Sequence, residues 1–441
     1  MTLKFGTDGV RGIADEELTP DLVMHLGRAA ARVLDAPVFV VGRDTRRSGP
    51  HLQDAFSLGL AAEGADVVDV GVLPTPAVAG LCVARGTAGA VVSASHNPWT
   101  DNGVKVFAPG GSKLNDEVEE RLESELARLL DLRQGGGGAG EVRADPGAAD
   151  WYVEQVVASM EGRSLDGMHV VIDCANGAAS PVAGRVFEAV GARVDVIHAE
   201  PDGTNINDRC GSTHPEDLQK AVVAVGADAG LALDGDADRV VAVDGGGALV
   251  DGDRLLALCA VDRRDRGRLA GNTVVVTVMT NLGFRLAMAE HGIEVVETQV
   301  GDRYVLEALE RGGWSLGGEQ SGHVIFRDLA TTGDGLLTGL QLLDVVRRAG
   351  RPLAELATDA MQRFPQVLRN VRVTSRDGLD GAAVVWDEVA AAEARLGERG
   401  RVVLRPSGTE PVVRVMVEAA TEEQAETEAA HLASVVEQAL A

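Results

Sequence analysis

The chain has 441 residues, and since domains usually hold about 100–200 residues, we expect three or four of them. The formal net charge of −26 excludes nucleic acid and anionic membranes as partners, because both require a basic surface. A negatively charged substrate would need a local cluster of basic side chains. No uncharged apolar segment reaches the roughly 20 residues of a membrane span, and no signal-peptide core is visible. We therefore expect a cytoplasmic protein.

Short β-branched segments alternate with amphipathic helices along most of the chain, which predicts α/β domains with mixed, largely parallel sheets. The clearest predicted strands are residues 38–41, 67–70, 90–92, 169–173 and 273–279. The clearest predicted helices are residues 21–34, 114–132, 181–190 and 335–348. The glycine run at 135–138 fits neither element and is interpreted as a flexible excursion. No internal repeat is evident.

The tail differs, because a strand, a helix (382–396), two strands (402–405 and 412–417) and a long helix to residue 441 indicate a smaller C-terminal α+β domain. We predict four domains, at residues 1–150, 151–252, 253–365 and 366–441. The four cysteines lack C-x-x-C spacing and are expected to be buried free thiols.

A polar segment directly follows the predicted strand at residues 90–92. It contains Ser95, His96, Asn97 and Pro98, and the Asn-Pro pair predicts a turn that presents the serine. Ser95 is a candidate nucleophile or phosphate carrier at a strand end, where ligands bind in α/β sheets. Alone, the segment is better explained as an ordinary loop, and it lacks the G-x-S-x-G pattern of serine hydrolases.

Three aspartates alternate in a second segment, between two apolar strands. Asp234, Asp236 and Asp238 lie on a tight turn opened by Gly235, and without a cation they would repel one another. A metal site is favoured over a solvated acidic turn. Few ligands, all of them oxygen, suit Mg²⁺. The EF-hand pattern is excluded, because Arg239 stands where that loop requires glycine.

Two further loops carry polar groups. Residues 317–323 place Glu319, Ser321 and His323 among glycines, a pattern able to bind sugar hydroxyls but weak alone. Residues 405–414 form a plausible phosphate cradle. Its candidate ligands are Arg405, Ser407, Gly408, Thr409 and Arg414.

Isolated basic residues recur in other glycine-rich loops, namely Arg11 and Arg303. Lysine occurs at only four positions, and Lys105 lies shortly after Ser95. A lysine in a chain that otherwise uses arginine is a candidate proton donor, although drift explains it equally well.

Together, residues 5–12, 93–98, 234–239, 318–323 and 405–414 resemble, in order, the motifs of the α-D-phosphohexomutase family. The resemblance spans all four units and implies three α/β domains and a smaller C-terminal domain around a central cleft. Residues 201–215, residues 300–305 and Gln320 are similar to the glucosamine-phosphate branch of that family. Pro406 departs from the lysine that is frequent before its Ser-Gly-Thr cradle.

The resemblance implies a role for each motif. Ser95 would carry the phosphoryl group and join Asp234, Asp236 and Asp238 around one Mg²⁺ per chain. Glu319, Ser321 and Arg303 would bind the sugar phosphate, and the 405–414 cradle would hold the phosphate that is not reacting. Lys105, Arg11, His96 and His323 would assist proton transfer and charge stabilisation.

The implied reaction interconverts glucosamine 6-phosphate and glucosamine 1-phosphate through phosphorylated Ser95 and a 1,6-bisphosphate. Glucosamine 1,6-bisphosphate or glucose 1,6-bisphosphate would be the activator. The expected partner is a small phosphosugar, and a homodimer is one open oligomeric state. The alternatives are a mannose- or glucose-phosphate mutase, an aspartyl-phosphate phosphatase and a non-catalytic phosphosugar sensor. Asp238 argues against the phosphatase, which usually has Thr or Val at that position.

Overall fold

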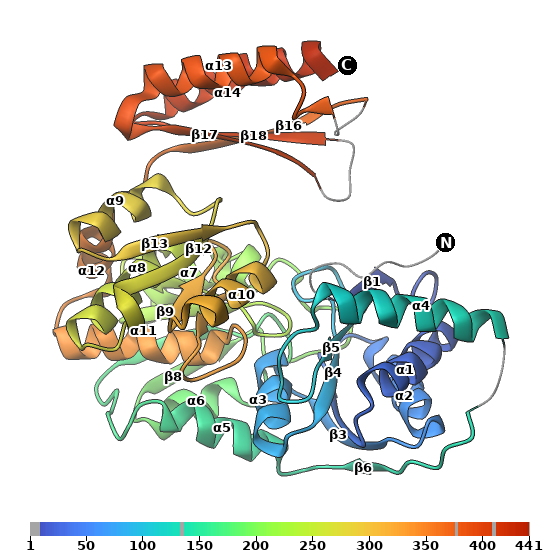
Figure 1. Cartoon of the computed structure of the whole chain (residues 1–441). Coiled ribbons are helices and arrows are strands. Elements are labelled where there is room, and N and C mark those ends of the chain that lie inside the picture. Colours follow the sequence, from blue (N-terminus) through green and yellow to red (C-terminus); the bar gives the residue numbers. More distant parts are fainter. Residues whose placement is uncertain (1–8, 133–135, 375–377, 408–411, 441) are drawn as a thin grey trace.

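The computed structural model describes residues 9–132, 136–374, 378–407 and 412–440. Figure 1 shows three α/β units and a smaller unit formed by the C-terminal segment. This is the predicted architecture, three α/β domains followed by an α+β domain. Among the described residues, no helix is both long and apolar enough to cross a membrane.

The first domain contains a six-stranded sheet in the order β1-β5-β4-β2-β3-β6. Its strands are β1 (Val10–Ile13), β2 (Val38–Arg43), β3 (Asp66–Val72), β4 (Ala88–Val92), β5 (Asp101–Phe107) and β6 (Val142–Ala144). Its helices are α1 (Pro20–Leu34), α2 (Gly49–Ala62), α3 (Thr75–Arg85) and α4 (Asp116–Leu132). Helix α1 begins where the Thr19 side chain accepts a hydrogen bond from Leu22 N, with Pro20 in the first turn.

The second domain follows α5 (Ala148–Ala158) and contains a five-stranded sheet in the order β11-β10-β9-β7-β8. Its strands are β7 (His169–Asp173), β8 (Arg193–Ile197), β9 (Ala229–Leu233), β10 (Val240–Asp244) and β11 (Leu249–Val250). Its helices are α6 (Ala183–Ala189) and α7 (Glu216–Val225).

The third domain contains a four-stranded sheet in the order β13-β12-β14-β15. Its strands are β12 (Thr273–Thr277), β13 (Glu294–Thr298), β14 (Leu316–Gly318) and β15 (Val324–Phe326). Its helices are α8 (Gly252–Asp265), α9 (Leu282–Glu290), α10 (Asp302–Gly312), α11 (Gly335–Ala349) and α12 (Leu353–Ala360). One continuous apolar core joins residues of the first three domains.

These three sheets share one topology, which the sequence did not reveal. In each, a strand has parallel neighbours on both sides, and one of those neighbours pairs with an antiparallel strand that follows it in the chain. The connections from β4 to β5, from β9 to β10 and from β14 to β15 are therefore equivalent. They contain the serine, the three aspartates and the Glu-Gln-Ser-Gly-His segment, respectively.

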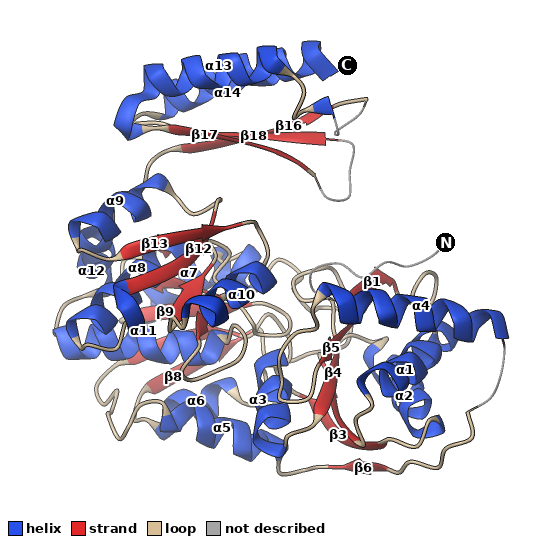
Figure 2. Ribbon diagram, viewed as in Figure 1, coloured by secondary structure: helices blue, strands red, loops and turns tan. Residues whose placement is uncertain are grey.

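The C-terminal domain is an antiparallel sheet, β16-β18-β17, covered on one face by two helices. Its elements are β16 (Gln366–Arg372), α13 (Ala383–Leu396), β17 (Arg401–Pro406), β18 (Val412–Glu418) and α14 (Glu422–Leu440). Figure 2 shows α13 and α14 on the face turned away from the rest of the molecule. The other face is turned toward the first three domains.

The elements whose ranges were predicted agree with the observed ones to within a few residues. Many others had no predicted range, among them strand β5, which carries Lys105. The described part of the glycine run, residues 136–138, is irregular as expected, yet it packs on the end of α2. Gly138 N donates to Ala62 O (2.8 Å), and a Cβ on Gly136 would lie 2.2 Å from the same oxygen. Glycine is thus required there for close backbone contact. All four cysteines are free and buried, as predicted.

A buried carboxylate joins the C-terminal domain to the third domain. Glu418, at the end of β18, is fully buried and accepts hydrogen bonds from Asn281 Nδ2 (3.1 Å) and Leu282 N (3.0 Å) at the start of α9. It also accepts one from Arg401 Nε (2.6 Å) on the adjacent strand. Arg401 in turn donates to Thr280 O. The carboxylate therefore anchors the end of β18 to the start of α9 in the third domain.

We expect Glu418→Ala to reduce the free energy of unfolding by about 3–5 kcal/mol, because it leaves Arg401 buried without its anion. The free energy of unfolding of Glu418→Gln should lie between those of the wild type and Glu418→Ala, since the amide keeps one hydrogen-bond acceptor. Chemical denaturation measures the change, and Glu423→Ala on exposed α14 is the control. Equal stability of Glu418→Ala and the control would mean that this joint is not a structural anchor.

Candidate active site

Ser95 lies in the turn after β4 and is held in an unusual backbone conformation. Its φ is 51°, in the left-handed region that non-glycine residues seldom adopt. Ser95 N donates to Ser93 Oγ (3.0 Å), and Ser93 Oγ donates to Asp44 (2.6 Å). Asp44 also forms an ion pair with Arg46, and both side chains are completely buried. A chain of buried polar contacts therefore fixes the serine.

Two side chains from different domains hold the carbonyl oxygens of this turn. Arg46 Nη2 donates to Ser95 O (3.1 Å) and Asn97 O (2.6 Å). Asn207 Nδ2, from the second domain, donates to the same two oxygens at 2.9 and 3.1 Å. The turn is thus fixed from both sides, and its position depends on the packing of the second domain against the first.

The three aspartates follow β9 directly, and all are buried, with exposed fractions of 0–2%. Gly235, between the first two, allows this turn to approach the serine, because a Cβ there would lie 2.6 Å from Ser95 O. Ser95 Oγ donates to Asp234 Oδ2 at 2.6 Å. The serine hydroxyl and the acidic turn, 139 residues apart in sequence, therefore share one site.

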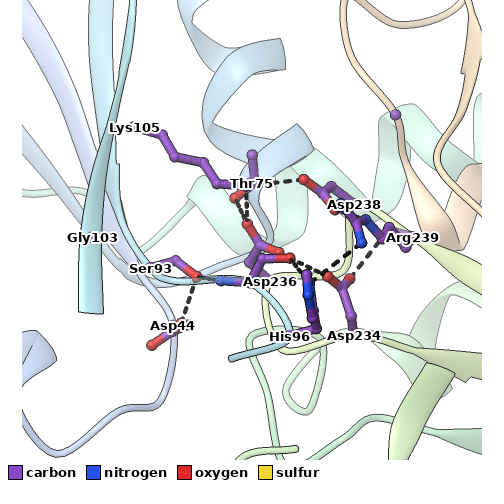
Figure 3. Close-up of polar contacts among 12 residues, drawn as sticks. Asp44, Thr75, Ser93, His96, Gly103, Lys105, Asp234, Asp236, Asp238 and Arg239 are labelled. Atoms are coloured by element: carbon purple, nitrogen blue, oxygen red, sulfur yellow. Dashed lines mark hydrogen bonds and ion pairs between the residues drawn. The ribbon is translucent and has the colours of Figure 1, made fainter. Parts of the chain in front are cut away.

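Donors from the first domain offset part of this buried charge. Lys105 Nζ, on β5, contacts Asp236 Oδ2 (2.7 Å) and Asp238 Oδ2 (3.0 Å). Thr75 Oγ1, at the start of α3, donates to Asp236 Oδ2 (2.6 Å). Figure 3 shows these side chains converging from the two domains.

The charge on the triad is still undercompensated. Burial, with the charges of Asp238 and Asp236, raises the pKa of Asp234 well above its ordinary value. Burial alone would also raise the pKa of Asp238, but Lys105 and His323 outweigh it and lower that pKa. Asp236 Oδ1 and Asp238 Oδ1 are buried and accept no hydrogen bond from the described residues. Carboxylate oxygens with free lone pairs around one point fit a hard divalent cation, so the triad could bind a metal.

The predicted acid–base residues surround this cluster. His96 Nδ1 lies 3.4 Å from Ser95 Oγ and 3.3 Å from Arg239 Nη1. Burial, followed by the charges of Arg239 and Arg11, lowers the pKa of His96 to about 4, so its imidazole is neutral at physiological pH. Arg11 lies on β1 opposite Gly103 of β5, and residues 5–8 of its motif fall outside the described part of the chain.

The loop between β14 and β15 of the third domain, residues 319–323, also contacts the acidic turn. His323 Nδ1 lies 3.7 Å from Asp238 Oδ1, and its pKa is raised because Asp238 and Asp302 outweigh the effect of burial. Glu319 accepts hydrogen bonds from Gly301 N (3.1 Å) and Ser321 Oγ (3.4 Å). The loop is therefore held by a contact within it, from Ser321, and by one from Gly301 at the start of α10.

Arg303 is placed differently from the other predicted site residues. Its side chain is only 5% exposed and forms ion pairs with Asp116, Glu119 (2.7 Å) and Glu307 (3.4 Å). The first two carboxylates belong to α4 of the first domain. A contact between Arg303 and a substrate would require these ion pairs to open.

Arg405 and Arg414 face each other across β17 and β18. Val413, Val415 and Val417 pack against the helices, so the alternating side chains of β18 point to the other face. Burial and the charge of Arg414 lower the pKa of Arg405, and neither Nε has a hydrogen-bond partner among the described residues. Two adjacent guanidiniums with free donors favour an anion. Gly408 and Thr409 lie outside the described residues, and Ser407, the last described residue before them in the chain, is buried.

Comparison with known sequences places this site in a family. The chain matches the four domain models of phosphoglucomutase/phosphomannomutase: domain I over residues 2–132, domain II over 150–247, domain III over 251–364 and the C-terminal domain over 368–435. The chain therefore belongs to the phosphoglucomutase/phosphomannomutase family, which confirms the resemblance found in its motifs. The predicted domain boundaries at 150, 252 and 365 remain predictions.

Curated relatives give a narrower comparison. The chain is 55% identical to a protein named phosphoglucosamine mutase from Rhodococcus opacus, over 98% of both chains. It is 54% identical to the protein of that name from Frankia alni, over 100% of this chain and 99% of the relative.

Solved structures agree on the fold. A phosphoglucomutase/phosphomannomutase family protein from Burkholderia thailandensis superposes with a TM-score of 0.83 at 28% identity, covering 98% of this chain and 97% of that one. An N-acetylphosphoglucosamine mutase from Aspergillus fumigatus, solved with GlcNAc-6P and magnesium, superposes with a TM-score of 0.72. At 19% identity, covering 100% of this chain and 96% of that one, it shows the shared fold alone.

Sequence reasoning missed the residues that position the serine and the triad. These are Asp44, Arg46, Thr75, Asn207 and Arg239. A buried Asp-x-Arg pair after a strand was a weak signal for the first two. Thr75 and Asn207 contact the site across a domain boundary, which their local sequence does not reveal. Arg239 belongs to the acidic motif itself, but no role was predicted for it from the sequence.

We expect Asp234→Asn to leave the metal-free protein close to wild-type stability but to abolish most of its stabilisation by Mg²⁺. A ligand at 100 times its dissociation constant stabilises the native state by about 2.7 kcal/mol. Most of this stabilisation is lost when a carboxylate that binds the Mg²⁺ ion is removed. Thermal unfolding with EDTA and then with excess Mg²⁺ measures both quantities. Asp150→Asn, on exposed α5, is the control. An unchanged Mg²⁺ effect in Asp234→Asn would show that the triad does not hold the ion.

Proposed function

We propose that this chain is an isomerase that interconverts glucosamine 6-phosphate and glucosamine 1-phosphate through phosphorylated Ser95. The observation that carries the proposal is the 2.6 Å contact between Ser95 Oγ and a buried triad of aspartates. The choice of sugar rests on full-length relatives, 52–55% identical to this chain, that are named phosphoglucosamine mutase.

Phosphoryl transfer requires mainly positioning of the reacting groups and neutralisation of charge on the transferred phosphoryl. Arg46 and Asn207 position Ser95 through its backbone. Lys105 and Arg239 place positive charge beside the triad and the serine hydroxyl. The triad residues would hold one Mg²⁺, with an oxygen of phosphorylated Ser95 as a further ligand, and the ion would supply charge neutralisation at the phosphoryl oxygens.

In the proposed cycle, phosphorylated Ser95 gives its phosphoryl group to the free hydroxyl of the sugar phosphate. The sugar then carries two phosphates and turns end over end before Ser95 Oγ takes back the other one. The proton of the attacking sugar hydroxyl needs an acceptor near the triad. His96 is the candidate acceptor by position, since its neutral imidazole places Nδ1 3.4 Å from Ser95 Oγ. Lys105, a cation that contacts two triad carboxylates, is proposed to donate a proton and to stabilise charge.

The phosphate that is not reacting needs its own binding site, because either end of the bisphosphate must be able to occupy it. Arg405 and Arg414 supply two guanidiniums whose Nε atoms have no hydrogen-bond partner among the described residues, and Ser407 follows Arg405 by two residues. An anionic substrate needs a local cluster of basic side chains in a protein with a net charge of −26, and this arginine pair is such a cluster. A bound anion would also remove the repulsion between the two arginines. Glu319 and Ser321 are proposed to contact sugar hydroxyls, and a 1,6-bisphosphate is the proposed activator.

We expect kcat/KM for glucosamine 1-phosphate to exceed the values for glucose 1-phosphate and mannose 1-phosphate by at least about tenfold, a difference of about 1.4 kcal/mol. Ser95→Ala should abolish turnover of all three, because a methyl group cannot carry phosphate. Coupled steady-state assays measure these rates, and circular dichroism checks the fold of the variant. A preference for mannose phosphate would assign the chain to another branch, and turnover by Ser95→Ala would exclude the phosphoserine route.

Asn207→Ala should lower kcat by roughly 5- to 150-fold, because two neutral hydrogen bonds contribute about 1–3 kcal/mol together. KM should change little, since the amide contacts the serine turn rather than a substrate. Steady-state kinetics separates the two constants. Asn205→Ala removes an amide that binds only its own turn, through Glu200 O, and should affect kcat less. Equal losses in both variants would point to general disruption of the loop.

A further inference from the structure

A second group of metal-ligating side chains lies outside the proposed active site. Asp173 is the last residue of β7, and His198 directly follows β8, whose Ile197 is the register partner of Asp173. Cys210 reaches the same place because Gly211 N donates to Asp173 Oδ2 at 2.9 Å. One ligand atom from each of the three side chains lies within 4.8 Å of the others.

The donor set is a carboxylate oxygen, an imidazole nitrogen and a sulfur. This combination suits Zn²⁺ or Co²⁺ and does not suit Mg²⁺, which prefers oxygen ligands. Asp173 and Cys210 are at most 1% exposed, whereas the His198 side chain is 28% exposed. An ion there would have three protein ligands and one side near solvent, where water completes a tetrahedron.

His198 Nδ1 faces the Asp173 carboxylate, and the geometry of this contact is compatible with a shared metal ion. This nitrogen is buried and lies 3.0 Å from Asp173 Oδ2, yet it forms no well-directed hydrogen bond with any described residue. A nitrogen and an oxygen that both bind one tetrahedral ion at about 2.0 Å lie a little more than 3 Å apart, so the observed separation fits shared ligation.

The surrounding groups also match a metal site. Asp173 Oδ1 accepts from Ala175 N (2.8 Å), which orients the carboxylate. His198 Nε2 lies 3.9 Å from Asp217 Oδ2, and a carboxylate at the other ring nitrogen is the usual partner of a metal-bound histidine. The backbone is strained here, since Ala175 and His198 have φ values of 52° and 48°.

We propose that Asp173, His198 and Cys210 bind one transition-metal ion of the Zn²⁺ type, separate from the Asp234 triad. Binding forms a metal–sulfur bond and releases the Cys210 thiol proton, and any proton on His198 Nδ1, to solvent. The ion would fix the segment that carries Asn207, whose N–H donates to Ala175 O (2.9 Å) and whose side chain holds Ser95 O. The site thus supports the active serine without sharing a ligand with it.

Titration of the full-length enzyme with Co²⁺, in excess Mg²⁺ to occupy the acidic triad, tests the proposal. We expect one Co²⁺ per chain, with tetrahedral ligand-field bands and a thiolate-to-cobalt charge-transfer band that Zn²⁺ abolishes. Cys210→Ser should lose the charge-transfer band, and its affinity for Co²⁺ should fall by roughly 100-fold or more. Removing a residue that only hydrogen-bonds a metal ligand already costs up to about 100-fold, and here the ligand itself is removed. Cys259→Ser, at another buried free cysteine, should retain both.

His198→Gln provides a second test that does not depend on the fold of Cys210→Ser, because its side chain is partly exposed. It should weaken Co²⁺ binding. Its mutase rate in Mg²⁺ alone, measured beside the wild type with no transition metal added to either protein, shows that the variant is folded. If the charge-transfer band is absent in the wild type, or persists in Cys210→Ser, the three side chains do not bind a metal ion. They are then only an ion pair between His198 and Asp173 beside the buried Cys210 thiol. Loss of the band in Cys259→Ser would place the thiolate elsewhere. Each of these three results overturns the proposal, and none bears on the phosphoserine reaction.

Discussion

Three buried carboxylates within five residues of chain are the feature on which the rest of the site depends. Asp234, Asp236 and Asp238 would repel one another without positive groups, and burial increases that repulsion. The groups that offset it come largely from the first domain, through Lys105, Thr75 and Ser95. The acidic turn of the second domain is therefore stable only when the first domain packs against it. Assembly of the domains and assembly of the site are the same event.

The repeated topology explains how loops so distant in sequence meet. Each of the first three sheets presents its connection between a parallel strand and the following antiparallel strand, and glycine lets these connections touch. A Cβ on Gly235 would lie 2.6 Å from Ser95 O, and one on Gly322 would lie 2.1 Å from Val240 O. The C-terminal domain lacks this topology and instead contributes a sheet face with Arg405 and Arg414. The hydrogen bonds of Glu418 to Asn281 and Leu282 attach β18, which carries Arg414, to the third domain. They therefore help to set the position of the arginine pair relative to that domain.

Much of this could be predicted from sequence, because local patterns determine local structure. Strand β7 matched its prediction at both ends. The resemblance to the phosphohexomutase family grouped Ser95 with Asp234, Asp236 and Asp238. Asn207 and Thr75 could not be found in this way, since they reach the site from 112 and 161 residues away. Arg303 shows the opposite difficulty. Its glycine-rich loop indicated a substrate contact, whereas the structure pairs it with carboxylates of α4.

The central claim is that Ser95 passes its phosphoryl group to the sugar. The most direct test is a single-turnover, rapid-quench experiment with enzyme that carries a radiolabelled phosphoryl group on Ser95. The account predicts that label leaves the protein and appears in glucosamine 1,6-bisphosphate at a rate no slower than kcat. If the label stays on Ser95 while unlabelled glucosamine phosphates interconvert, the phosphoserine is not an intermediate and the account is wrong.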